Sequence, residues 1–229
     1  MNPYWEDEST EEGAAFRNRY DAGRRLAANL RRYAGRDDVV VLALPRGGVP
    51  VGYEVGRALG AQLDVFGVRK LGVPGREELA MGAIASGGVR VVNEDVVQAL
   101  QIPPSMIEEV AEVERRELER RESAYRDGRP RPDVRDKVVI LVDDGLATGA
   151  SMRAAVAALR KLRPSRIVVA VPVGARETCA ELATEADEAV CAVMPEPFVA
   201  VGAWYENFDQ TTDDEVRELL ARGTTRSPR

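Results

Sequence analysis

The residues best suited to chemistry lie in the stretch VVILVDDGLATGAS, residues 138–151. Two adjacent carboxylates, Asp143 and Asp144, stand between an apolar run and a turn of glycine, threonine and serine. A turn between the end of a strand and the start of a helix presents unpaired backbone N–H groups and favours an anion. Adjacent carboxylates accept hydrogen bonds from vicinal hydroxyls. Because a sugar phosphate carries both kinds of group, the stretch indicates sugar-phosphate binding.

Two other loops carry charged side chains among glycines. In LPRGGVPVG (44–52), Arg46 supplies positive charge, and Gly47 and Gly48 allow close approach of the backbone, which suits a pyrophosphate. An ordinary glycine turn before a helix is the alternative. VRKLGVPGREELAMGA (68–83) has the composition of a lid over a site, or of a solvated charged loop.

An aromatic cluster lies near the end of the chain, in PEPFVAVGAWYENFDQTTDDEV (195–216). Trp204 and Tyr205 could stack on a planar base. Packing of this segment onto the core or onto a dimer partner is an equally good interpretation. Thr212 is expected to cap a last helix, with Glu215 three residues later.

The elements that must position these loops follow one repeating pattern, in which apolar runs of strand length alternate with helical segments. Such a pattern predicts an α/β fold with a doubly wound, mostly parallel sheet, whose ligands bind beyond the carboxyl ends of the strands. The expected strands are 39–45, 63–70, 137–144, 166–173 and 188–194, and the expected helices are 14–34, 49–59, 105–126, 150–162 and 174–185. Residues 81–93 are expected to form a hairpin that turns at Ser86-Gly87-Gly88.

The expected domain organisation is one core with appendages. It comprises a mobile N-terminus (1–13), a core (14–194) with a helical insertion (103–130), a C-terminal hood (195–222) and a mobile tail (223–229). The insertion should carry a surface helix that opens with a capping box from Ser105 to Glu108.

Composition excludes several classes of protein. The 229 residues include 45% hydrophobic and 31% charged residues, and no apolar run reaches the roughly 20 residues of a membrane span. A net charge of −6 argues against a nucleic-acid partner, and the absence of histidine excludes histidine triads and histidine metal sites. Cys179 and Cys191 are interpreted as small core residues. No secretion signal is recognisable at the start, so a cytoplasmic location is expected.

The stretch VILVDDGLATGAS (139–151), with the other two loops in the same order, resembles the type I phosphoribosyltransferase family. VRKLGVPG and AVGAWYENF are similar to a poorly characterised bacterial subgroup of it. The resemblance implies a fold with a flexible lid loop and a small hood, and a homodimer. It implies transfer of a 5-phosphoribosyl group from 5-phosphoribosyl 1-pyrophosphate (PRPP) to a nitrogen acceptor, such as a nucleobase, with release of pyrophosphate and dependence on Mg²⁺.

The resemblance also implies roles for individual residues. Asp143 and Asp144 would hold the ribose hydroxyls and, through water, Mg²⁺ that is bound mainly by PRPP. Together with Arg46 and Lys70 they would form the catalytic set. The 5-phosphate would be bound by Gly145, Leu146, Ala147, Thr148, Gly149, Ala150 and Ser151. Pyrophosphate would be bound by Arg46, Gly47, Gly48, Arg69 and Lys70, in a loop that often contains a cis peptide.

Three alternatives compete with this function. A regulator of the same fold could sense PRPP or a nucleotide with little catalysis. A nucleotide triphosphatase would need a Gly-Lys pair in its phosphate loop, and this sequence has none. A dinucleotide-binding domain would need G-x-G-x-x-G after a strand, which is also missing.

Overall fold

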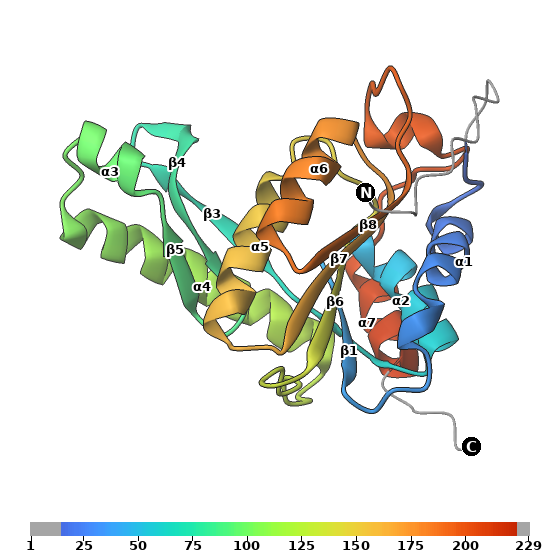
Figure 1. Ribbon diagram of the computed structural model, residues 1–229. Coiled ribbons are helices and arrows are strands. Elements are labelled where there is room, and N and C mark those ends of the chain that lie inside the picture. The colour runs from blue at the N-terminus through green and yellow to red at the C-terminus, as the bar shows by residue number, and fades with distance from the viewer. Residues whose placement is uncertain (1–14, 224–229) are drawn as a thin grey trace.

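The computed structural model describes residues 15–223, which form a central sheet and a smaller second sheet (Figure 1). The segments expected to be mobile, 1–13 and 224–229, lie outside the described residues, whereas Gly223 ends the last helix. All neighbouring strands of the central sheet are parallel, in the order β2-β1-β6-β7-β8. They are β1 (Val39–Ala43), β2 (Gln62–Val65), β6 (Val138–Val142), β7 (Arg166–Val173) and β8 (Glu188–Val193).

Helices cover both faces of this sheet, as the continuous apolar runs predict (Figure 1). Successive residues of a strand face opposite sides, so Val39 and Val41 pack on one face, and Val40 and Leu42 on the other. The first face is covered by α1 (Arg19–Asn29), α2 (Gly48–Leu59) and α7 (Asp213–Gly223), and the second by α5 (Ala150–Lys161) and α6 (Arg176–Glu185). The expected doubly wound sheet is therefore confirmed.

The second sheet is antiparallel and projects from the core as an arm, on the left in Figure 1. Its strands are β3 (Val68–Val73), β4 (Arg76–Ala85) and β5 (Val89–Val92), and the helices beside it are α3 (Glu94–Ala99) and α4 (Pro104–Arg126). A separate apolar cluster, which includes Leu71, Met81 and Ile107, stabilises the arm. The expected hairpin over 81–93 is confirmed, because β4 turns into β5 over 86–88.

The apolar run 63–70 is not one strand, contrary to the sequence-based expectation. It divides at Phe66 and Gly67 into β2, in the central sheet, and β3, in the arm. A Cβ atom at Gly67 would overlap the end of the Leu118 side chain in α4, so the missing side chain lets the chain pass close to that helix. The segment 68–83, expected as a loop, is instead folded as the β3–β4 hairpin.

Helix α4 differs from its prediction at its start and in its packing. It begins at Pro104 after Pro103, without a capping hydrogen bond from a side chain, so the capping box from Ser105 is wrong. Proline suits the first turn because its missing N–H would have no partner inside the helix. One face of α4 is buried, including Ile107 and Leu118. With 23 residues it is also strongly charged, and none of the helices within residues 15–223 is apolar enough to cross a membrane.

The two cysteines are buried but not free, which corrects their interpretation as ordinary core residues. Cys179 of α6 and Cys191 of β8 form a disulfide. No motif in the sequence marks this pairing; the two cysteines are 12 residues apart, and the packing of α6 on β8 brings them together.

Candidate active site

The acidic pair and the arginine turn meet at the carboxyl end of the central sheet. Leu44, which follows β1, donates its N–H to the carbonyl of Val142, the last residue of β6, at 2.8 Å. A Cβ atom on Gly48 would lie 2.9 Å from Cα of Asp143, and one on Gly47 would overlap the Asp144 carboxylate. The two loops therefore contact each other through the glycine backbone.

The two carboxylates of the pair are in different environments. Burial and the neighbouring charge of Asp144 raise the pKa of Asp143 well above its ordinary value. The backbone N–H of Asp144 donates to Asp143 Oδ1 at 2.8 Å, which fixes the orientation of that side chain. Asp144 forms an ion pair instead, with its Oδ2 at 2.8 Å from Nε of Arg19.

The turn after the acids has the geometry of an anion site. Its carbonyl groups point back into the protein, where Ala147 O accepts from Thr178 Oγ1 at 2.7 Å and Thr148 O accepts from Arg153. Within residues 15–223, the N–H groups of Ala147, Thr148 and Gly149 have no recorded acceptor. Gly149, with a φ of 70°, leads into the first turn of α5, whose N–H groups lack partners inside the helix.

Leu146 differs from the rest of the predicted phosphate loop. Its N–H donates to Val173 O and its carbonyl accepts from Ala175, both at 2.9 Å. Leu146 therefore fastens the loop to the end of β7, and its N–H is already used. The open part of the turn runs from Ala147 to Ser151.

Arg46 directly precedes the two glycines that contact the acidic pair, and its side chain is accessible. Its side chain is 36% exposed, and Nη1 lies 3.7 Å from Oδ1 of Asp213, at the start of α7. The peptide bond between Pro45 and Arg46 is cis, as the resemblance implied.

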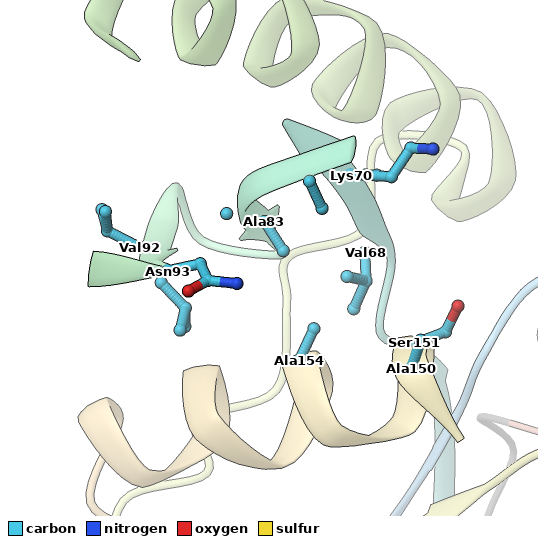
Figure 2. Close-up of a pocket in the computed structure, with 11 residues that line it drawn as sticks. Val68, Lys70, Ala83, Val92, Asn93, Ala150, Ser151 and Ala154 are labelled. Carbon is cyan, nitrogen blue, oxygen red and sulfur yellow. The ribbon is translucent and has the colours of Figure 1, made fainter. Parts of the chain in front are cut away.

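The side chains of Arg69 and Lys70 lie on opposite sides of β3 and have different neighbours. Arg69 forms an ion pair with Glu114 of α4, whereas Lys70, the next residue of the strand, faces the other side. Lys70 lines a pocket of about 310 Å³ between the arm and α5, which Ala150 and Ser151 of the phosphate loop also line (Figure 2). The pocket wall is mostly apolar and includes Val68, Ala83, Val92 and Ala154.

The aromatic residues near the C-terminus contact the acidic loop. Tyr205 is 5% exposed, its hydroxyl donates to Asp144 O at 2.6 Å, and its ring packs between Phe16 and Phe208. Because these two rings already pack against it, Tyr205 fits the packing interpretation of this segment better than base stacking. Trp204 is half-buried, and its indole Nε1 has no hydrogen-bond partner in the described part of the chain.

Arg19 is the site residue that the sequence analysis missed. It begins α1, and 125 positions separate it from Asp144, to which it is bonded. No local motif marks it among the other arginines of the same region, so only the folded structure singles it out.

Comparison with known proteins identifies the family. A model of the phosphoribosyl transferase domain matches residues 10–202 of this chain. The chain belongs to the phosphoribosyltransferase family. Two Mycobacterium tuberculosis proteins, from strains CDC 1551 and H37Rv, are each named "Putative phosphoribosyl transferase". Each is 47% identical to this chain over 207 residues, which cover 90% of this chain and 46% of the relative. The chain thus spans about half the length of these curated relatives.

A solved structure supports the same assignment. The protein TT1426 from Thermus thermophilus, whose crystal structure is solved, is 42% identical in sequence to this chain. The match covers 92% of this chain and 99% of that chain, with a TM-score of 0.81. The expected type I phosphoribosyltransferase fold is confirmed by these relatives together with the parallel sheet.

The carboxylates fit a magnesium ion only as part of a larger ligand set. Mg²⁺ prefers six oxygen ligands in octahedral geometry and often shares them with a phosphate substrate. Residues 15–223 contain no cluster of three or more histidine, cysteine, aspartate or glutamate side chains that could hold a metal. Asp143 and Asp144 could supply two carboxylates, so oxygens of a bound donor would have to complete the set.

Proposed function

We propose that this phosphoribosyltransferase transfers the 5-phosphoribosyl group of PRPP to a nitrogen acceptor, with release of pyrophosphate. One observation carries the proposal: Asp143 and Asp144 contact the Arg46 turn through Gly47 and Gly48, and the open N–H groups of residues 147–149 follow shortly after them in the chain. Carboxylates that can accept hydrogen bonds from hydroxyls are thus close to two candidate sites for anions. A ribose that carries a phosphate at one end and a pyrophosphate at the other has this combination of groups.

We assign each part of the donor to one part of the site. The acids accept hydrogen bonds from the ribose hydroxyls, and the backbone of 147–151 binds the 5-phosphate. Arg46 and the backbone of Gly47 and Gly48 bind the pyrophosphate. Lys70, at the edge of the pocket in Figure 2, joins them if the hairpin moves toward the site.

The reaction breaks the bond from ribose C1 to the pyrophosphate oxygen, which leaves with the electron pair, and forms a bond from C1 to nitrogen. The acceptor's proton leaves to solvent. Arg46 stabilises the leaving group, and the carboxylates stabilise the positive charge that develops on the ribose. Mg²⁺, when bound through the donor and the two aspartates, neutralises pyrophosphate charge.

For the acceptor we propose a nucleobase, stacked on Trp204. The half-buried indole supports this assignment, since Trp204 is partly exposed and directly precedes Tyr205, which contacts the acidic loop. The homodimer implied by the resemblance stays a prediction.

Titration calorimetry with PRPP and Mg²⁺ tests the donor site. We expect binding by the wild type and at least about tenfold weaker binding by Asp144→Asn, because a charged hydrogen-bond acceptor is lost. Asp133→Asn, which changes an exposed acid before the start of β6 rather than at its carboxyl end, should bind like the wild type. Absence of PRPP binding by the wild type would contradict the proposal.

Pyrophosphate release across a panel of purines, pyrimidines and other nitrogen compounds tests catalysis. Release with one class of acceptor would identify the substrate. Tight PRPP binding without release for any acceptor would favour the regulator of the same fold over an enzyme.

A further inference from the structure

Arg19 is held on three sides at the edge of the acidic pair. Its Nε donates to Asp144 Oδ2 at 2.8 Å and its Nη1 donates to the carbonyl of Asp209 at 2.6 Å. The guanidinium carbon lies 3.9 Å from the centre of the Phe208 ring, and the side chain is 11% exposed. A planar guanidinium can satisfy a carboxylate, a carbonyl and an aromatic face together, and lysine cannot reproduce this set.

The backbone that presents Arg19 is also fixed. Asn18 caps α1 by accepting a hydrogen bond from the N–H of Asp21 at 3.0 Å. Phe16 forms a short parallel bridge with Tyr205, whose hydroxyl donates to Asp144 O. Asp144 is therefore held twice, at the carboxylate by Arg19 of α1 and at the carbonyl by Tyr205, which is paired with Phe16.

This arrangement leaves one oxygen of Asp144 for a ligand. Arg19 engages Oδ2, and within residues 15–223 no donor is recorded on Oδ1. The guanidinium also offsets one of the two adjacent negative charges, next to which a donor with several phosphate charges would bind. A fixed carboxylate binds a hydroxyl at a lower entropic cost than a mobile one. A reduced negative charge on the acid pair also weakens its repulsion of the donor phosphates.

We propose that Arg19 is a positioning residue, which holds Asp144 Oδ2 so that Oδ1 faces a ribose hydroxyl. The inference rests on the proposed function, since it concerns the donor site of that reaction. It predicts that Arg19 acts on PRPP only through Asp144.

A double-mutant cycle measures this dependence. PRPP affinity in the presence of Mg²⁺ is compared for the wild type, Arg19→Met, Asp144→Asn and the double variant. We expect Arg19→Met to weaken binding about ten- to hundredfold, because a charge-assisted hydrogen bond that orients the acid is lost. In the Asp144→Asn background the same change should have almost no effect, since its target is already altered.

The ribose hydroxyls provide a second readout that a general loss of stability would not change. The wild type should prefer ribose 5-phosphate to 2-deoxyribose 5-phosphate, and Arg19→Met should lose most of this preference. Arg31→Met removes the same charge from an exposed position and should keep it. Arg19→Lys retains the charge without the three contacts and should recover part of the affinity, which keeps the test usable if Arg19→Met does not fold.

Three results would overturn the inference. Additive effects in the cycle would show that Arg19 acts independently of Asp144. Tighter PRPP binding by Arg19→Met would show that the arginine competes with the donor. An unchanged hydroxyl preference would exclude a role in positioning. Failure of the wild type to bind PRPP would instead contradict the proposed function.

Discussion

Gly47 and Gly48 show how single residues allow an acid pair and an arginine turn to lie side by side. A Cβ atom on Gly48 would lie 2.8 Å from the Val142 carbonyl, which is too close for a real side chain. The sequence indicated that these glycines let the backbone approach a ligand. In the structure they also let it approach Asp143 and Asp144, so both types of contact depend on the missing side chains.

Asp143 is expected to lower the stability of the free protein. Its folded-state pKa is raised by burial and by Asp144, so its ionised form costs free energy in the folded state. Asp143→Asn should therefore raise the free energy of unfolding at pH 7 by about 0.5–2 kcal/mol and weaken PRPP binding. Denaturant unfolding and calorimetry measure the two effects.

The pH dependence of this effect has a definite sign. Above the raised pKa the folded protein carries the unfavourable charge, and the advantage of Asp143→Asn is complete. As the pH falls from the raised value to the ordinary one, the wild type gains a proton and the advantage disappears. An advantage that grows toward acid pH would contradict the assignment.

At the scale of elements, the turn after β6 depends on the segment that crosses above it. A Cβ atom on Gly145 would overlap a methyl group of Val201 and lie 2.8 Å from the other. Val201 of the 3-10 turn Val201–Trp204 fills the space that a side chain on Gly145 would need. The C-terminal segment and the phosphate loop therefore form one packed unit.

Gly145→Ala tests this packing. We expect the overlap with Val201 to lower the free energy of unfolding by about 1–3 kcal/mol. In a Val201→Ala background the same substitution should cost much less, because both methyl groups are gone. Thermal unfolding of the four proteins gives the coupling energy, and equal costs in both backgrounds would refute the contact.

At the scale of the whole molecule, helix α4 joins the arm to the core through a buried charge network. Arg126 Nε donates to Asp64 of β2 at 2.9 Å and Arg126 Nη1 donates to Glu122 at 3.0 Å. Glu122 also accepts hydrogen bonds from Ser86 and from the Gly67 N–H, where the arm begins. Burial raises the pKa of Asp64, although the charge of Arg126 acts in the opposite direction. The segment expected as an insertion is thus part of the structural support of the arm.

Removal of Arg126 from this buried charge network should lower the free energy of unfolding. Arg126→Met leaves Asp64 buried without its cation and leaves Glu122 with Arg131 alone, and we expect the free energy of unfolding to fall by about 3–5 kcal/mol. Arg120→Met on the same helix breaks an ion pair whose arginine is 68% exposed, and it should cost less than about 1 kcal/mol. Similar losses for both variants, measured by denaturant unfolding, would show that the network has no special role.

The sequence predicted the parallel core, the helices around it and the loops at its carboxyl edge, because their signals are local. Val138 to Val142 and the following helix are recognisable from apolar pattern and turn residues alone. The break at Gly67 and the pairing of Arg19 with Asp144 depend on residues distant in the chain, whereas the cysteines of the disulfide are only 12 residues apart but form no recognisable motif. For Tyr205 the sequence left packing and base stacking open, since its packing partner Phe16 lies at the other end of the described chain.

The bridge between Phe16 and Tyr205 also bears on the order in which the site is completed during synthesis. Asp143 and Asp144 leave the ribosome well before Tyr205 and Asp209 do. Arg19 is made early, but its carbonyl partner follows 190 residues later. A nascent chain would thus contain the acid pair before the contacts from Tyr205 and Asp209 can form. Donor binding should therefore reach full strength only after the C-terminal segment has been released.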